Sequence, residues 1–345
     1  MGATATVLSE ANVPPALTQT ARVNFLDCVQ DDLAAVEVLL GDEIRSDVRA
    51  AYAISGHTLS AGGKRLRPAL VTLAARAAGQ FPARTIYASA AAAELIHMAS
   101  LIHDDVVDGA AERRGRPTAN AAFGNQISVL VGDYLLAKSI NLAAREGNID
   151  VICVFSKVTV GLSEGEVLQI TAKGDVDTSE ETYLTIIHKK TAGFIAGCCE
   201  VGGMLAGASP AALSALTRYG LNCGLAFQIA DDLLDYTGDP VKTGKPQCGD
   251  LREGKMTLPL ILTLLDVGEA ERRDLLHILQ EPEALTDTEV ANVRDTIARH
   301  NGYARTADAA RRYVGLAQEA LAVLPVSPYR DALHSLADYA LTRER

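Results

Sequence analysis

The 345-residue chain has no tryptophan, and aromatic residues make up only 5% of it. It also lacks the long alternation of apolar and polar residues that builds a β-sheet, and it contains no repeat of fixed period. Alanine- and leucine-rich runs with three-to-four spacing fill the chain instead, and these residues favour helices. The sequence therefore predicts an all-α protein.

Basic residues do not outnumber acidic ones either, and the formal net charge is -11 at pH 7. Binding nucleic acid over a broad surface requires a basic face, so we expect no nucleic-acid partner. The acidic total still allows phosphate ligands, because local clusters of lysine and arginine can occur within an acidic protein.

The six cysteines form no C-x-x-C pair, and no spacing of cysteine and histidine suits zinc. No run of about 18 uncharged apolar residues has the character of a membrane span. The first basic residue is Arg22, so the N-terminus lacks the charged region of a signal peptide. These absences indicate reduced thiols in a cytoplasmic protein.

The chain divides into a short arm and one long helical region. Residues 1–20, which include Pro14-Pro15, are expected to form a flexible N-terminal arm. Ser179 and Ser209-Pro210 are typical of helix starts. We predict a single all-helical domain over residues 21–345, with central helices around a deep cavity.

Two carboxylate runs of the same form stand out, Asp-Asp-Val-Val-Asp at 104–108 and Asp-Asp-Leu-Leu-Asp at 231–235. In each run the first and last aspartates are four residues apart, which places them on one face of a helix. Both runs lie in apolar surroundings, where carboxylates are costly unless a positive charge pairs with them. A divalent cation such as magnesium, held by carboxylates together with substrate phosphates, fits this pattern.

Basic residues occur near both runs. Lys64 and Arg67 lie in a glycine-rich loop before a helix start, and their spacing lets them converge on one anion. Arg113 and the adjacent Arg114 point in different directions, which suits two different anions, and arginine grips phosphate through paired hydrogen bonds. The alternative for any one cluster is a solvated charged surface. His97 lies two helical turns before the first run, where it is either a ligand contact or a structural core histidine.

In its aspartate runs and basic motifs the chain resembles the trans (E-type) polyprenyl diphosphate synthases of the isoprenoid synthase type I family. It is most similar to the octaprenyl and decaprenyl enzymes. The resemblance covers most of the chain after about residue 24. Two aspartate runs in order, with the basic motifs around them, are far more specific than one run. The similar stretches are 63–68, 94–97, 101–108 with 113–115, 190–191, 227–236, 244–245, 253–259 and 333–339.

The resemblance implies an enzyme that ionises an allylic diphosphate and condenses the resulting cation with isopentenyl diphosphate, head to tail and repeatedly. It implies about three Mg²⁺ ions per site. The implied metal ligands are Asp104, Asp108 and Asp231, and the residues that orient metal-bound water are Asp105, Asp232, Asp235 and Asp250. The implied contacts of the allylic diphosphate are Arg113, Lys190 and Lys245, and those of isopentenyl diphosphate are Lys64, Arg67, His97 and Arg114. The implied residues beside the carbocation are Thr191 and Gln228, which we group with Lys190 as catalytic.

One motif departs from the family pattern. Similar proteins carry Gly-Asp-Asp after the Gly-Lys pair, whereas this chain has Cys248-Gly249-Asp250. Asp250 can still serve the water shell of a metal ion. The missing aspartate puts closure of the loop over the site in doubt.

Product length is expected to depend on the residues below the first aspartate run. Ser100 and Ala99 precede Asp104 by four and five residues, roughly 6 to 7.5 Å along the helix. Short-chain members of the family place a bulky aromatic here, whereas both side chains are small in this chain. An open floor predicts a long all-trans product, octaprenyl to decaprenyl, of the kind that feeds a quinone side chain.

Three alternatives stay open at this stage. A geranylgeranyl or other shorter-chain synthase would share the motifs, and abundant alanine alone could account for Ala99. A non-catalytic subunit of a heteromeric synthase would usually have lost an aspartate run or the basic loop. A terpene cyclase would carry an Asn/Ser/Glu metal motif in place of the second run. We further expect a homodimer and transient contact with a membrane surface when the apolar product leaves.

Overall fold

The computed structural model describes residues 25–79, 83–238 and 247–342. The predicted arm over residues 1–20 lies outside these residues. The helices of the first half are α1 (Gln30–Glu43), α2 (Arg49–Ser60), α3 (Leu66–Ala78), α4 (Ala83–Val107), α5 (Ala119–Phe123), α6 (Asn125–Arg145) and α7 (Ile149–Thr171). Those of the second half are α8 (Glu180–Ile187), α9 (Gly193–Leu205), α10 (Pro210–Thr237), α12 (Gly249–Arg252), α13 (Leu258–Leu264), α14 (Glu269–Ile278), α15 (Asp287–Arg299), α16 (Gly302–Ala320) and α17 (Pro328–Thr342).

Shorter elements join these helices. The 3₁₀ turns are η1 (Asp27–Val29), η3 (Pro282–Ala284) and η4 (Leu321–Val323). The π-helical turn is η2 (His188–Ala192). The strands of the described residues are β1 (Glu112–Arg113) and β2 (Arg116–Pro117), which pair antiparallel in one small hairpin. The prediction of an all-α protein is therefore confirmed.

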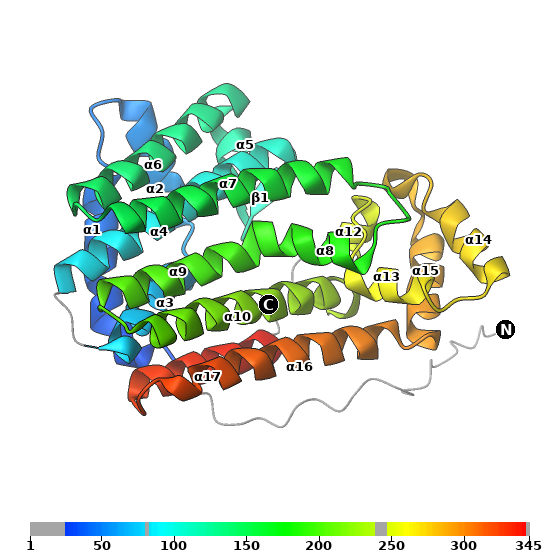
Figure 1. Cartoon of the computed structure of the whole chain (residues 1–345). Coiled ribbons are helices and arrows are strands. Elements are labelled where there is room, and N and C mark those ends of the chain that lie inside the picture. Colours follow the sequence, from blue (N-terminus) through cyan, green and yellow to red (C-terminus); the bar gives the residue numbers. More distant parts are fainter. Residues whose placement is uncertain (1–24, 80–82, 239–246, 343–345) are drawn as a thin grey trace, which may run out of the picture.

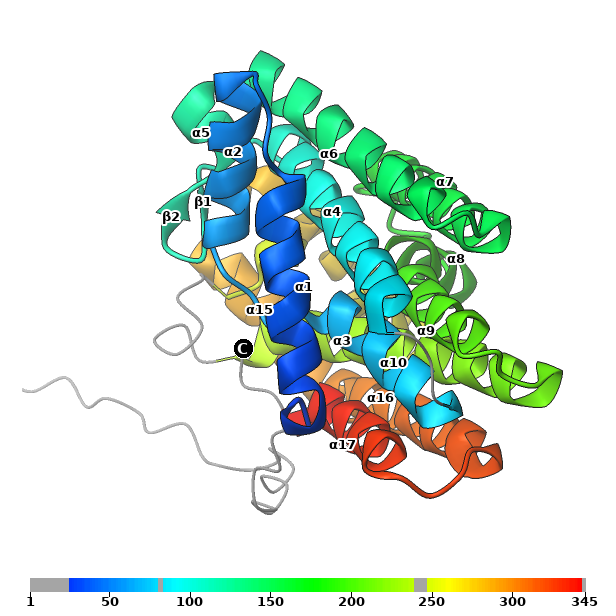
Figure 2. The same ribbon diagram turned by 90° about the vertical axis from the view of Figure 1, so that its left-hand side faces the viewer.

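The long helices run side by side as a bundle, and α13, α14 and α15 gather at one end of it (Figure 1). Seen from the side, α4 lies inside the bundle with α1, α6 and α3 around it (Figure 2). Local sequence explains several helix starts. Ser179 and Ser209 accept backbone N–H groups of Thr182 and Ala212 at 3.0 and 3.3 Å, as predicted for N-caps.

Small residues let the central helices approach closely. Residues 90–93 of α4 are four consecutive buried alanines. Gly202 of α9 lies against α3, where an added Cβ would come within 2.3 Å of the Val71 carbonyl oxygen. The abundant alanine of the sequence thus serves tight helix packing, and this packing fixes the direction in which α4 and α10 present their aspartates.

Two helices, Arg84–Val107 and Asn125–Arg145, are long and apolar enough to cross a membrane by composition alone. The apolar window of the first is 72% buried inside the fold, so this helix is a core helix. The window of the second is only 39% buried, which leaves part of its apolar surface uncovered.

Candidate active site

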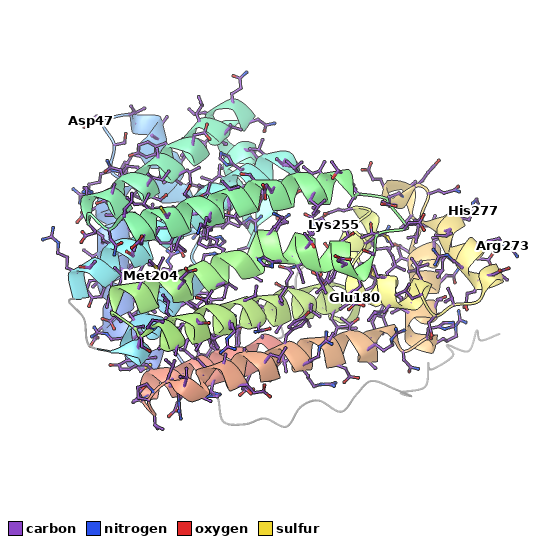
Figure 3. The ribbon with its side chains drawn as sticks, viewed as in Figure 1. Asp47, Glu180, Met204, Lys255, Arg273 and His277 are labelled. Carbon is purple, nitrogen blue, oxygen red and sulfur yellow. The ribbon has the colours of Figure 1, made fainter. Side chains whose placement is uncertain are left out.

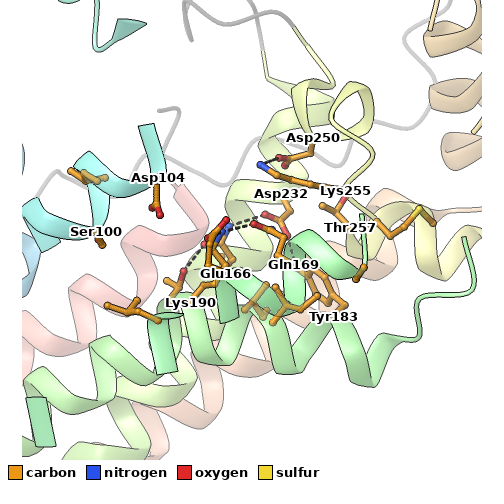
Figure 4. Close-up of a pocket in the computed structure, with 18 of the residues that line it drawn as sticks. Ser100, Asp104, Glu166, Gln169, Tyr183, Lys190, Asp232, Asp250, Lys255 and Thr257 are labelled. Atoms are coloured by element: carbon orange, nitrogen blue, oxygen red, sulfur yellow. Dashed lines mark hydrogen bonds and ion pairs between the residues drawn. The ribbon is translucent and has the colours of Figure 1, made fainter. Parts of the chain in front are cut away.

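A cavity of about 370 Å³ lies between α4, α7, α8 and α10. Figure 4 shows Ser100 and Asp104 entering it from α4, opposite Tyr183, Asp232 and Asp250. Ten of the side chains predicted from sequence line this one cavity, namely Arg67, His97, Ser100, Asp104, Arg113, Lys190, Thr191, Gln228, Asp232 and Asp250. Residues from both aspartate runs and from both basic sets therefore meet in one place.

The other predicted residues lie around this cavity rather than among its lining residues. Ala99 and Asp105 are buried in α4, while Asp108, Asp231, Lys64 and Arg114 are exposed. Asp235 is half-buried. Lys245 lies outside the described residues, so its predicted contact with the allylic diphosphate stays a prediction.

The first aspartate run is electrostatically strained. Burial raises the pKa of Asp104 to about 6, and the carboxylates of Glu166 and Asp108 add to the shift against the opposing effect of Lys190. Burial likewise raises the pKa of Asp108. Both groups would be stabilised in their charged form by a cation, which is the property expected of metal ligands.

Asp105, between these two aspartates, has a different environment. Its carboxylate is 5% exposed and accepts two hydrogen bonds from the Arg113 guanidinium, at 2.7 and 2.9 Å. Asp105 therefore fixes Arg113 at the edge of the cavity. Its predicted role in orienting metal-bound water stays a prediction.

The second aspartate run joins a chain of hydrogen bonds. Asp232 accepts from the Tyr183 hydroxyl at 2.6 Å and from the Gln228 amide at 2.8 Å. Thr191 donates to the Gln228 amide oxygen at 2.8 Å, so the two residues predicted beside the carbocation are in direct contact. Burial, together with the nearby Asp250, raises the pKa of Asp232 to about 7.

Asp235 secures the segment that departs from the family motif. Its two carboxylate oxygens accept the backbone N–H groups of Gly249 and Asp250, each at 3.1 Å. Cys248 adopts a left-handed backbone with φ of 59° and is fully buried. This conformation favours glycine and marks the cysteine as locally strained.

The π-helical turn η2 carries Lys190 and Thr191 into the cavity. Gly165 of α7 permits this, because a Cβ there would lie 2.8 Å from Cγ of Lys190. The Lys190 ammonium contacts the Glu166 carboxylate and the Gln169 amide oxygen. Lys190 is thus held across the cavity from Asp104 (Figure 4).

The cations predicted for isopentenyl diphosphate lie near the start of α3. The Arg67 guanidinium stacks on the Phe194 ring at 4.8 Å, and burial lowers its pKa. Burial, with Arg67 and Arg114 nearby, holds the pKa of His97 well below its usual value, so its imidazole is neutral. Nε of Arg67 and Nδ1 of His97 are buried without a hydrogen-bond partner among the described residues, as expected of groups that await a polar ligand.

The lining residues that the sequence-based prediction of the site did not include are several, and among them are Glu166, Gln169, Tyr183 and Lys255. Glu166 and Gln169 lie one turn apart in an apolar helix, and that pattern could have identified them. Lys255 lies 2.6 Å from Glu253 and 3.6 Å from Asp250. Burial alone would lower its pKa, but Asp250, Glu253 and Asp108 outweigh burial and raise it. Tyr183 carried no signal in the sequence.

The described residues contain no group of three or more His, Cys, Asp or Glu side chains close enough to hold a metal ion by themselves. The carboxylates that line the cavity instead come from four helices, with Asp104 in α4, Glu166 in α7, Asp232 in α10 and Asp250 in α12. This donor set fits a cation that is shared with phosphate oxygens of a ligand, which is how magnesium usually binds.

The fold and the cavity define a class of helical enzymes in which acidic and basic side chains meet around one cavity. The profile named Polyprenyl synthetase matches residues 48–297, and the chain belongs to this family. The prediction of a polyprenyl diphosphate synthase, and hence of a prenyltransferase, is confirmed.

Relatives and solved structures agree with this assignment. The chain is 38% identical to an octaprenyl diphosphate synthase of Escherichia coli (strain K12), covering 91% of this chain and 96% of the relative. A decaprenyl diphosphate synthase structure from Rhodobacter capsulatus has a TM-score of 0.88 and 40% identity, covering 93% and 99%. A polyprenyl synthase structure from Caulobacter crescentus, complexed with calcium and isoprenyl diphosphate, has a TM-score of 0.87 and 39% identity, covering 93% and 97%. The family is metal-dependent.

Proposed function

We propose that this chain is a long-chain all-trans polyprenyl diphosphate synthase with a product of octaprenyl to decaprenyl length. The observation that carries the proposal is the cavity itself, where both aspartate runs lie beside cations and where Ser100, a small side chain, forms part of the wall. The similarity to enzymes named octaprenyl and decaprenyl diphosphate synthase supports the long product.

The allylic diphosphate is bound at the end of the cavity where the aspartates lie. Arg113 and Lys190 contact its oxygens, and Lys245 belongs to the same proposed set. Asp104, Asp108 and Asp231 would hold magnesium, about three ions with substrate bound, while Asp232 and Asp250 would orient the water around the ions. When bound, magnesium supplies positive charge that stabilises the departing diphosphate.

Isopentenyl diphosphate is bound by Lys64, Arg67 and Arg114, with neutral His97 donating one N–H. This arrangement brings its double bond toward the first carbon of the allylic chain. Because both diphosphates are anchored, the two carbons meet without a further loss of freedom at the moment of reaction.

The chemistry follows from this placement. The carbon–oxygen bond of the allylic diphosphate breaks, and its electron pair leaves with the diphosphate. The oxygens of Thr191 and Gln228 face the cation that remains. The double bond of isopentenyl diphosphate then forms the new carbon–carbon bond, and the released diphosphate takes the proton that is lost.

We propose a homodimer built on α6 and α7, which lie in contact at one edge of the bundle (Figures 1 and 2). Val160 and Val167 of α7 lie two turns apart on one face and are 54% and 61% exposed. Leu130 of α6 is 65% exposed. An uncovered apolar surface of this kind marks a protein contact.

We also propose that the enzyme works in the cytoplasm and supplies quinone side chains. All six cysteines are free thiols, which fits a reducing compartment. The product is far more apolar than its precursors, so its release requires a transient contact with a membrane surface.

Turnover by the purified chain tests the proposal. The chain alone, with an allylic primer, isopentenyl diphosphate and magnesium, should release diphosphate, and mass spectrometry should find eight to ten isoprene units. A product of four units or fewer would establish the shorter-chain alternative. A folded chain without turnover would favour the non-catalytic subunit.

A further inference from the structure

We propose that Tyr339 of α17 is a positioning residue for Lys64, and that the C-terminal helix thereby takes part in binding the second diphosphate. The proposal rests on the function proposed above. It starts from a direct contact, because the Lys64 ammonium donates to the Tyr339 hydroxyl and lies 4.7 Å from the centre of its ring.

Lys64 needs such a partner because of where it lies. It is exposed in the loop between α2 and α3, where Gly62 and Arg65 have φ values of 75° and 48°. An exposed lysine side chain has several freely rotating bonds, and fixing it on a ligand costs conformational freedom. A partner that holds the ammonium in place beforehand lowers this cost.

Tyr339 is a rigid partner. The Phe25 ring packs against it, with ring centres 5.3 Å apart. The helix that carries it is fixed to α10 by a 2.7 Å hydrogen bond from the Tyr219 hydroxyl to the Leu333 carbonyl. The neighbouring Asp338 accepts from Gln318 of α16 at 2.8 Å.

The chemistry of Tyr339 matters as much as its position. A phenol is neutral, so it holds Lys64 without cancelling the charge that would bind diphosphate. Only one of the three ammonium hydrogens is used, which leaves two for phosphate oxygens. A carboxylate in the same place would hold Lys64 equally well and remove the net positive charge.

The neighbouring cations are held in the same manner. Arg67 rests on the Phe194 ring, and Arg114 donates to the Gly62 carbonyl oxygen. Within the described residues, no ion pair involves Lys64, Arg67 or Arg114. By contrast Arg65, in the same loop, pairs with Glu37 at 2.8 Å and with Glu94 at 3.2 Å.

The test uses the full-length enzyme with Tyr339→Phe, which removes the hydroxyl, and Tyr339→Leu, which removes the hydroxyl and the ring. We expect the KM for isopentenyl diphosphate to rise about 3- to 10-fold in the first and about 10- to 50-fold in the second. The KM for the allylic primer should not change in either variant, and the thermal unfolding midpoint should stay the same in Tyr339→Phe, whereas Tyr339→Leu loses the ring contact with Phe25 and should unfold at a lower temperature. Tyr329→Phe, at the other end of α17, is the matched control.

A double-mutant cycle decides whether Tyr339 acts through Lys64. In a Lys64→Ala background, Tyr339→Phe should leave the KM for isopentenyl diphosphate unaltered. The proposal is overturned if Tyr339→Phe has no effect in the wild-type background, if it lowers that KM, or if its full effect persists without Lys64. A wild-type chain that makes no polyprenyl product would instead overturn the function on which the proposal rests.

Discussion

The two proposed diphosphate sites of the cavity differ in how their cations are held. At the aspartate end, Arg113 pairs with Asp105, Lys190 with Glu166, and Lys255 with Glu253. At the other end, the partners of the cations are a phenol, an aromatic ring and a backbone carbonyl. The net charge of the aspartate end is therefore close to zero or negative in the absence of metal. The net charge of the other end is positive.

This difference gives a physical reason why one diphosphate needs metal and the other does not. A diphosphate entering the aspartate end meets carboxylates as well as cations, so added positive charge is required for it to stay. A diphosphate entering the other end meets cations whose direct partners are neutral, with the buried Glu94 as the main carboxylate acting on Arg67. The partners of the cations, rather than their number, separate the two sites.

The largest effect should come from Asp104→Asn, which removes a charge from the aspartate end. We expect kcat to fall by about 10³-fold or more, because charge stabilisation of the leaving group contributes several kcal/mol. Binding of isopentenyl diphosphate, measured by calorimetry, should be unaffected. Asp42→Asn, whose exposed carboxylate pairs with Arg45 at 3.3 Å, is the control. An Asp104→Asn enzyme within 10-fold of wild type would refute the metal-ligand assignment.

Stability without metal should depend on pH through the same residue. The Asp104 carboxyl has a pKa of about 6 in the folded protein against its usual 3.8, so the folded state holds the proton more tightly. Folding is therefore favoured below pH 4 and loses stability as pH rises through 6, by on the order of 3 kcal/mol. In EDTA, the thermal midpoint of Asp104→Asn should exceed that of wild type at pH 8, and the gap should shrink toward pH 4. A difference in thermal midpoint between Asp104→Asn and wild type that does not vary with pH would contradict the raised pKa of Asp104.

Replacing one arginine at each end of the cavity, Arg67 or Arg113, by lysine should affect the KM of a different substrate in each case. Arg67→Lys keeps the charge but loses the planar stack on Phe194, so we expect about a 10-fold higher KM for isopentenyl diphosphate alone. Arg113→Lys, which loses its paired bonds to Asp105, should raise the KM for the primer alone. Exposed Arg45→Lys serves as the control. Equal effects on the KM values of both substrates would show that the two diphosphates do not bind at separate ends of the cavity.

The smallest effect on the reaction rate should come from Ser100, whose side chain forms part of the cavity wall. The length of the product should nevertheless change measurably. Ser100→Phe places a ring in the cavity and should shorten the product by several isoprene units while the first condensation continues. Ala99→Phe should mainly lower the stability, because Ala99 is only 2% exposed and does not line the cavity. An unchanged product from Ser100→Phe would show that the chain grows elsewhere.

The sequence predicted the helical fold and most of the charged residues that line the cavity, because helix periodicity and paired charges are local signals. It missed Glu166 and Tyr183, whose roles depend on partners far away in the chain, Lys190 and Asp232. It also could not tell that Asp105 and Asp235 already bind Arg113 and the start of α12. Whether a cation has a charged or a neutral partner is decided by tertiary packing, so the comparison of the two ends required the structure.

The most direct test is the metal dependence of binding at each end. Titration calorimetry should be done with isopentenyl diphosphate and with an unreactive thiolo analogue of the primer, each in Mg²⁺ and in EDTA. We predict that the Kd of isopentenyl diphosphate changes less than about 3-fold, whereas the primer analogue loses about 100-fold or more without metal. An equal dependence of both diphosphates on Mg²⁺ would contradict the account.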